Sequence, residues 1–277
     1  MNTFLCPVCH SPLARQQASW RCIKGHSFDM AAQGYVNLLL SSQKHAKIPG
    51  DSKEMVSARE RFLAAGYYGF LRNRVAQEAA KLLKECQHPF VVDAGCGEGW
   101  YTAEIAKQVW QSAGNCTVMG LDISKFALKS AAKKDSRILW AVASIFSMPV
   151  ADASADLVVN IFAPIAGDEF ARVLKKGGYL MTVAPGPNHL FALKKELYDT
   201  PYRNGDVPVP ENTGDFSLVE RIEIGQEFTV NTQQLLQDLF QMTPYCWKSP
   251  REAKERLAAM DSLSMEGDFV LCIYRRR

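Results

Sequence analysis

The chain has 277 residues, of which 47% are hydrophobic and 22% charged, and it carries a formal net charge of +3. These values are ordinary for a soluble globular protein, and the length suffices for one sizeable core with a small appendage. No stretch approaches the roughly 18 uncharged apolar residues of a membrane-spanning helix. The residues before Cys6 include no basic region followed by an apolar one, so we expect no membrane span and no secretory signal.

The cysteines are distributed as in a protein of a reducing compartment. Three of the eight lie within the first 22 residues, and the others are scattered singly along the chain: Cys86, Cys96, Cys116, Cys246 and Cys272. This pattern lacks the regular spacing of a disulfide framework. We therefore expect a cytoplasmic protein.

The segment "CPVCHSPLARQQASWRCIKGH" places four metal-ligand side chains close to the N-terminus. Cys6 and Cys9 are separated by two residues, Cys22 and His26 by three, and twelve residues lie between the two pairs. Because two such turns complete a tetrahedron, the spacing predicts a structural zinc site with no open coordination position. The residues around the second pair show no helical apolar period, so we expect a zinc ribbon built on short hairpins and not a helical finger.

Basic side chains gather on the same module. Residues 1–50 hold five Lys or Arg residues against one acid, whereas the remainder of the chain sums to −1. Arg15, Arg21 and Lys24 lie between the metal ligands, and Lys44 and Lys47 follow them. Such a cluster points to a polyanionic partner. A solvated surface without a partner explains the same charges equally well.

The next part of the chain is predicted to be helical. The apolar residues of "PGDSKEMVSARERFLAAGYYGFLRNRVAQEAAKLL" recur near a period of 3.6 residues. Gly66 interrupts the pattern and places Tyr67 and Tyr68 at a junction between two helices.

A glycine-rich loop follows the apolar run Phe90–Val92. In "DAGCGEGW" the glycines alternate (Gly95, Gly97 and Gly99), whereas a dinucleotide-binding loop would require its third glycine where this chain has Trp100. Asp93 and Glu98 make the loop acidic, which disfavours a pyrophosphate and suits a ligand with an amino-acid tail and a positive sulfur. A second predicted strand, "TVMGLDIS", ends in Asp122, and an acid at this place can accept both ribose hydroxyls.

These motifs resemble those of class I S-adenosylmethionine-dependent methyltransferases: D-x-G-x-G-x-G, "GLDIS" and "ARVLKKGGYLMTVAP", in which Lys176 replaces a common proline. Further strands are expected within residues 137–144, 155–164, 178–186 and 267–277. The fold class is therefore α/β, with a doubly wound, mostly parallel seven-stranded class I methyltransferase sheet behind a small N-terminal zinc-binding domain. We expect residues 1–36 to form a zinc-ribbon domain for RNA recognition, 37–85 a helical linker that contributes to the cofactor site, and 86–277 the methyltransferase domain.

The whole chain resembles the bacterial 23S rRNA (guanine-N1)-methyltransferases. The resemblance is carried by "CPVCHSPL", "HSFDMAAQGYVNLL", "PGDS", "DAGCGEGWYT", "APGPNHL" and "QMTPYCW". It implies structural zinc on the four predicted ligands and S-adenosylmethionine as cofactor. The residues that motif position and resemblance together assign to the cofactor are Tyr68, Asp93, Gly95, Gly97, Glu98, Asp122, Ile123, Ser144 and His189. Tyr68 could instead be a core aromatic, and His189 could cap the following helix.

The resemblance also implies the substrate, a guanine in a hairpin loop of domain II of 23S rRNA, at position 745 or 748. N1 of guanine carries a proton at neutral pH, so a base or stabilisation of the ring anion is needed. The sequence does not identify this base, although Asn160 could grip the guanine edge and Asp168 could take a proton. Aromatic candidates for stacking on the splayed base are Phe162, Tyr202, Tyr245 and Trp247, and "YDTPYRNGDVPVPENTGDF" is expected to form a surface loop near the substrate.

Three functions remain open at this point. In the first, Arg15, Arg21 and Lys24 of the ribbon grip the RNA. In the second, the chain is a small-molecule methyltransferase whose ribbon only braces the fold or a dimer. The third, a non-enzymatic RNA-binding protein, is disfavoured by the intact glycine loop and Asp122. A homodimer is an expectation by analogy with the family.

Overall fold

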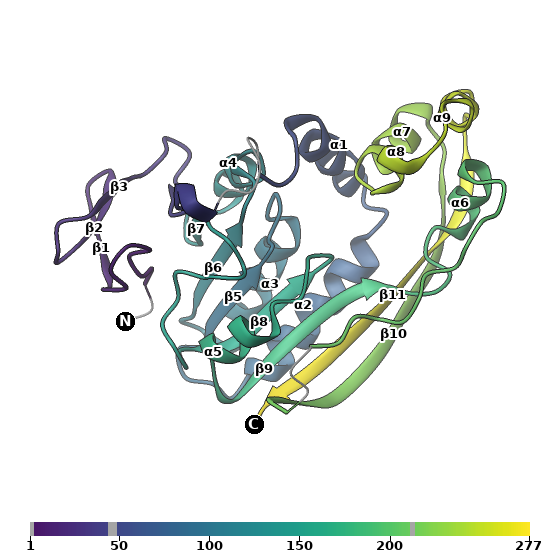
Figure 1. Ribbon diagram of the computed structural model, residues 1–277. Coiled ribbons are helices and arrows are strands. Elements are labelled where there is room, and N and C mark those ends of the chain that lie inside the picture. Colours follow the sequence, from purple (N-terminus) through teal and green to yellow (C-terminus); the bar gives the residue numbers. More distant parts are fainter. Residues whose placement is uncertain (1–2, 44–48, 211–213) are drawn as a thin grey trace.

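The computed structural model describes residues 3–43, 49–210 and 214–277, which form one small and one large sheet with surrounding helices (Figure 1). The small sheet is antiparallel and contains β1 (Leu13–Gln16), β2 (Ser19–Cys22) and β3 (Ser27–Asp29). This is the hairpin architecture predicted for the ribbon. Lys44 and Lys47, which contributed to the basic count, lie outside the described residues.

The large sheet is the predicted doubly wound sheet. Its strands, in spatial order, are β10 (Phe216–Val230), β11 (Leu263–Arg276), β9 (Leu174–Pro185), β8 (Ala155–Ile161), β5 (Phe90–Ala94), β6 (Thr117–Asp122), β7 (Leu139–Val142) and β4 (Val36–Asn37). Strands β4 to β9 pair in parallel, and β10 and β11 are antiparallel. Seven of these strands match the number expected for the class, and six of them (β5, β6, β7, β8, β9 and β11) lie where the sequence predicts strands. The two-residue strand β4 adds an eighth beside β7, at the residue where the predicted ribbon domain ends.

The helices occupy the intervals between the strands. They are α1 (Lys53–Ala64), α2 (Gly69–Leu83), α3 (Trp100–Ala113), α4 (Lys125–Lys134), α5 (Gly167–Val173), α6 (Phe191–Leu197), α7 (Gln233–Gln241), α8 (Tyr245–Lys248) and α9 (Arg251–Ala258), with a 3-10 turn η1 (Ser41–Gln43). Gly66 separates α1 from α2, as predicted. Helices α6 to α9 gather around the far ends of β10 and β11, on the side of the molecule opposite the ribbon (Figure 1). No described helix is long and apolar enough to cross a membrane.

Alternate residues of the sheet belong to two separate cores. Val91 of β5 packs in a cluster with apolar side chains of α1 to α4, whereas its neighbour Val92 packs in a second cluster on the opposite face. Successive side chains of a strand point to opposite faces, so a sheet covered on both sides must be apolar at nearly every position. The continuous apolar runs seen in the sequence have this origin.

The ribbon covers part of the second face. Phe4 and Trp20 are buried in the same cluster as Val92 and Phe170 of α5, and their rings meet edge to face with centroids 5.1 Å apart. The backbone N–H of Leu5 donates a hydrogen bond to the carbonyl of Pro149, 2.9 Å away, in the segment after β7. The ribbon therefore shares a core with the large sheet and is not suspended on a linker.

Strand β10 and helices α7 to α9 have no counterpart among the predicted elements. In β10, Ile222 and Ile224 face the core while Arg221 and Glu223 are exposed, an alternation that identifies a half-buried strand. The signal was present in the sequence, but the charged positions dominate the segment.

Candidate active site and metal centre

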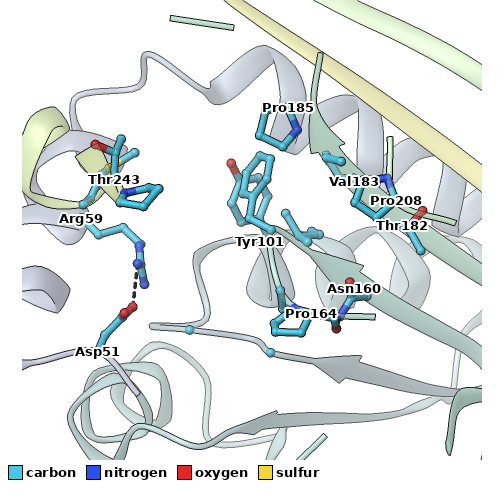
Figure 2. A pocket seen from close by; sticks show the side chains of 18 of the residues that line it. Asp51, Arg59, Tyr101, Asn160, Pro164, Thr182, Val183, Pro185, Pro208 and Thr243 are labelled. Atoms are coloured by element: carbon cyan, nitrogen blue, oxygen red, sulfur yellow. Dashed lines mark hydrogen bonds and ion pairs between the residues drawn. The ribbon is translucent and has the colours of Figure 1, made fainter. Parts of the chain in front are cut away.

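A cavity of about 720 Å³ opens at the carboxyl ends of β5, β8 and β9 (Figure 2). Strands β5 and β8 are neighbours whose connections run to opposite sides of the sheet, and the crevice at such a switch point is the usual ligand site of doubly wound folds. Eight of the nine predicted cofactor residues line the cavity: Tyr68, Asp93, Gly95, Gly97, Glu98, Asp122, Ile123 and His189.

The glycine loop is shaped by two close approaches. Gly95 has φ +92°, and a side chain there would come within 2.5 Å of the Cβ of Ala163 in the loop after β8. The N–H of Gly97 donates to Oδ2 of Asp122 at 2.9 Å, while Oδ1 of the same carboxylate accepts the N–H of Ser124 at 2.7 Å. Asp122 thus ties the turn after β5 to the turn after β6. Burial raises its pKa, although these two hydrogen bonds act in the opposite direction.

Unpartnered polar atoms concentrate around this cavity. Among the described residues, eight buried side-chain nitrogen or oxygen atoms have no hydrogen-bond partner, and five of them belong to residues that line it: Asp93 Oδ1, Glu98 Oε2, Tyr101 OH, Thr182 Oγ1 and His189 Nδ1. Such an atom costs roughly 1–3 kcal/mol when left unpaired. The protein therefore presents unused donors and acceptors to a polar ligand.

The side of the cavity next to the glycine loop is acidic. Asp93 and Glu98 are each 2% exposed, and Asp93 accepts a hydrogen bond of 2.6 Å from the hydroxyl of Thr102. Burial, together with the nearby Asp122 and Glu98, raises the pKa of Asp93 to about 7 despite that hydrogen bond. Burial also raises the pKa of Glu98, and the positive charge of Arg59 partly offsets this rise. Positive charge on a ligand would be stabilised here.

The opposite side is aromatic. The hydroxyl of Tyr68 lies 3.4 Å from Nε2 of His189, and the His189 ring packs on Phe269 with centroids 4.5 Å apart. Burial lowers the pKa of His189 to about 3, with a smaller contribution from the charge of Lys194, so the imidazole is neutral at physiological pH. Tyr68 is packed in the apolar core and also lines the cavity, so both interpretations from the sequence apply to it. His189 does not cap α6, which has no side-chain cap: its Nε2 lies beside Tyr68, and its Nδ1 has no hydrogen-bond partner among the described residues.

One wall is formed by the proline- and glycine-rich segment after α6, as predicted. Lys194 is fully buried, and its ammonium group donates to the carbonyl of Tyr202 at 3.2 Å and to Oδ1 of Asn204 at 2.6 Å. Asn204 in turn donates to the carbonyl of Gly186 at 2.7 Å. These contacts hold Tyr202 and Asn204 against the cavity, while residues 211–213 of the same segment lie outside the described residues.

Of the other residues that the sequence analysis singled out, some line the cavity and some do not. Asn160 lines the cavity, and its Nδ2 donates to the carbonyls of Ala94 and Pro164 at 3.0 and 3.1 Å. Ser144, Asp168 and Trp247 are not among the described residues of the lining. Ser144 accepts the N–H of Phe146 in the turn after β7, and Trp247 is 73% exposed.

The lining residues that were not anticipated include Asp51, Arg59, Tyr101 and Thr182. Figure 2 shows Arg59 reaching Asp51 on one side of the cavity, with Tyr101 and Thr182 farther across it. Thr182 gave a faint signal, because it is a single polar residue within the apolar run Leu180–Ala184. Arg59 gave none, since an arginine on an amphipathic helix is ordinary.

The four predicted metal ligands converge in the ribbon. Their ligand atoms all lie within 4.8 Å of one another, with Cys9 Sγ 3.6 Å from Cys22 Sγ, and His26 Nδ1 3.6 Å from Cys6 Sγ and 3.3 Å from Cys22 Sγ. Zinc–sulfur bonds of about 2.3 Å separate tetrahedral ligands by about 3.8 Å. Three thiol groups and one imidazole at these separations fit a tetrahedral zinc ion.

Comparison with protein families agrees with both halves of the structure. A zinc-ribbon family model described as "RlmA, N-terminal" matches residues 4–47, and a model described as "Methyltransferase domain" matches residues 91–178. Together with the sheet order and the cavity at its switch point, these matches define an S-adenosylmethionine-dependent methyltransferase of class I.

Relatives that match most of the chain show to which methyltransferase family it belongs. A protein of Streptomyces fradiae named 23S rRNA (guanine(748)-N(1))-methyltransferase is 32% identical over 96% of this chain and 95% of its own. A protein of Micromonospora griseorubida is 40% identical over 69% of this chain and 68% of its own, and YxjB of Bacillus subtilis is 30% identical over 98% and 96%. Both are named provisionally as 23S rRNA (guanine-N1)-methyltransferases. The chain belongs to this methyltransferase family.

The cavity fits the cofactor that this class requires. Acidic groups and unpaired acceptors beside the Gly97–Glu98 turn suit an ammonium and a sulfonium, and the cavity volume lies within the usual range for small-molecule sites. When bound, S-adenosylmethionine supplies an electrophilic methyl group. Asp122 retains acceptor capacity at the cavity, since a carboxylate has about four acceptor sites and the two N–H groups occupy two of them.

Zinc removal should unfold the ribbon without emptying the cofactor site. Structural zinc contributes about 10–16 kcal/mol to folding in peptide models, and none of the described residues 3–43 lines the cavity. We expect Cys22→Ala to lose its metal and show a lowered melting temperature, yet to bind S-adenosylhomocysteine with little change. The matched control is Cys116→Ala, which removes a thiol remote from the ribbon. Loss of cofactor binding in Cys22→Ala alone would show that the two parts are not separable.

Asp93 should produce a distinctive pH dependence of stability. Its pKa is about 7 in the folded protein against an ordinary value of 3.8, so the folded state holds the proton more tightly than the unfolded state. The free energy of unfolding should therefore fall as pH rises through about 7, by about 2–3 kcal/mol between pH 5 and pH 8. Asp93→Asn should abolish this part of the slope in urea unfolding. The exposed control Asp199→Asn should keep it, and equal slopes in Asp93→Asn and the native protein would contradict the assignment.

Proposed function

We propose that the protein transfers the methyl group of S-adenosylmethionine to N1 of a guanine in a hairpin loop of domain II of 23S rRNA. The observation that carries the proposal is the full-length match, ribbon included, to a relative named for this reaction. We propose guanine 745 as the target, with guanine 748, the position in the name of the Streptomyces fradiae relative, as the alternative.

We further propose that the predicted lining residues hold the cofactor. Tyr68 and His189 would enclose it from the aromatic side, the Gly97–Glu98 turn would receive its amino-acid tail, and Asp122 its ribose. In support, each of these five residues carries a hydrogen bond or an unpaired atom within the cavity wall described above. We also propose that Cys6, Cys9, Cys22 and His26 bind a structural zinc ion. The short distances between their four ligand atoms support this.

The target base has a candidate platform in Phe162. This residue adopts a left-handed backbone conformation with φ +55°, which is strained for a bulky side chain, and its N–H donates to the carbonyl of Val183 at 3.0 Å. Its ring lines the cavity and is 44% exposed. A strained aromatic presented to a cavity is an arrangement for stacking on a base that has been splayed from its loop.

Asn160 would act as an acceptor toward the guanine. Its Nδ2 is engaged by two backbone carbonyls, so any hydrogen bond that it makes to a ligand must use Oδ1. This oxygen can accept from the N1–H or the 2-amino group of guanine and so orient the edge that is methylated. As the bond from sulfur to the methyl carbon breaks and the bond to N1 forms, the N1 proton leaves to an acceptor that this chain's residues must position.

The ribbon would bring the RNA to this cavity. Arg15, Arg21 and Lys24 are exposed, and the intervening Ile23 is 93% exposed at the ribbon surface. The second candidate function, a small-molecule methyltransferase with a purely structural ribbon, is favoured by one observation, the core that the ribbon shares with the sheet. A module can both cover a sheet face and carry basic side chains on its outer surface, so this core does not argue against RNA binding.

Salt dependence distinguishes these functions. Binding of a domain II hairpin transcript should weaken steeply with salt, with about 0.7–0.9 in the log–log slope for each phosphate contacted. Replacing Arg15, Arg21 and Lys24 together by Gln should reduce the slope by about 2–3 while leaving the affinity for S-adenosylhomocysteine unchanged. A slope near zero in the native protein would contradict an RNA substrate.

Phe162 provides a direct test of the substrate side. Base stacking contributes about 1–3 kcal/mol by alanine substitution, so Phe162→Ala should lower kcat/KM for RNA methylation about 10- to 100-fold. Phe162→Tyr retains the ring and should stay within about threefold of the native enzyme, and the affinity for S-adenosylhomocysteine should be similar in both variants. An equal loss of cofactor affinity in Phe162→Ala would place the ring at the cofactor and contradict the proposal.

A further inference from the structure

The charges around the cavity are strongly unbalanced. Among the described residues that line it, the acids are Asp51, Asp93, Glu98, Asp122 and Asp206, and the cationic side chains at neutral pH reduce to Arg59, because His189 is held neutral. S-adenosylmethionine carries a carboxylate on its amino-acid tail as well as an ammonium group. A carboxylate placed among four or five acids requires a cation or several N–H donors close by.

Arg59 is positioned over the turn that would receive this tail. It projects from α1, and its Nη2 lies 2.6 Å from Oδ2 of Asp51. Its Nη1 is 3.7 Å from Oε2 of Glu98, which is longer than a hydrogen bond, and this oxygen has no hydrogen-bond partner among the described residues. A Cβ built on Gly97 would lie 3.6 Å from Nη1, so the guanidinium faces a turn without a side chain.

We propose that Arg59 binds the carboxylate of the cofactor's amino-acid tail while Glu98 receives its ammonium group. Nη1 of Arg59 and the unpaired Oε2 of Glu98, 3.7 Å apart, then form a site for a zwitterion, with one charged end of the ligand for each. The planar guanidinium can hold Asp51 on one edge and a second carboxylate on another, because its five N–H donors form a rigid fork.

The position of Arg59 is fixed by the start of α1. The hydroxyl of Ser52 caps this helix by accepting the N–H of Met55 at 3.3 Å, and the carbonyl of Asp51 accepts the hydroxyl of Ser124 at 2.8 Å. Ser124 is also held by Asp122, so the same network that ties the two turns together orients the Asp51–Arg59 pair. Helix α1 would thereby select ligands that carry an amino-acid tail.

The inference rests on the use of S-adenosylmethionine and not on the choice of guanine, so it is tested without RNA. The zinc-loaded, full-length protein is titrated calorimetrically with S-adenosylhomocysteine and with 5′-methylthioadenosine, which has the same nucleoside and thioether but lacks the tail. The native protein should bind S-adenosylhomocysteine at least about 10-fold more tightly. Arg59→Met should raise its Kd about 10- to 100-fold and change that of methylthioadenosine less than about threefold, as expected for a lost charge-assisted hydrogen bond.

Two further variants separate this role from a loss of stability. Arg61→Met removes the next arginine of α1, which pairs with the buried Asp238 of α7 at 2.6 and 2.9 Å and does not line the cavity. It should lower the melting temperature but keep the native ratio of the two affinities. Arg59→Lys keeps the charge and loses the fork, so its loss for S-adenosylhomocysteine should be smaller, about 3- to 10-fold. The proposal is overturned if Arg59→Met weakens both ligands equally, if it weakens neither, or if the native protein does not distinguish them.

Discussion

The rest of this structure depends on one constraint: among the described residues, several buried polar atoms around one cavity have no hydrogen-bond partner. Holding Asp93, Glu98 and His189 in this state is unfavourable, and the folded protein tolerates it only because a large, two-faced apolar core supplies the opposing stability. A ligand that pairs with these atoms removes the penalty, so binding and stability are linked. Three features hold the unpaired groups around the same cavity. They are the glycine loop, the carboxylate of Asp122 that bridges two turns, and the capped start of α1.

The ribbon both covers part of the large sheet and presents basic side chains to solvent. A parallel sheet buried on both faces needs a cover on each, and here α5 and the ribbon share one face while α1 to α4 take the other. A small module that cannot bury enough surface to fold alone gains stability both from its zinc ligands and from the sheet. Its basic residues Arg15, Arg21 and Lys24 remain exposed to solvent.

Local patterns in the sequence were sufficient for much of the site. The zinc ligands, the alternating glycines and Asp122 are identified by spacing within short segments, and the structure brings each set together. Tyr68 and His189 were assigned through the family resemblance, because they are 121 positions apart in the sequence and nothing in it indicates that they meet. Arg59 and Thr182 were missed for the same physical reason: their roles arise from contacts between distant elements. Strand β10 was missed because exposed charges on an edge strand obscured its alternation.

The central claim is tested most directly by methyl transfer itself. Large-subunit RNA that lacks its native modification is incubated with the zinc-loaded protein and S-adenosylmethionine carrying a labelled methyl group, and the product is mapped by primer extension. Methylation at N1 blocks Watson–Crick pairing, so we expect label in the RNA and a single new stop in the domain II hairpin, at guanine 745 or 748. Absence of label in the RNA, with S-adenosylmethionine still bound by the protein, would contradict it.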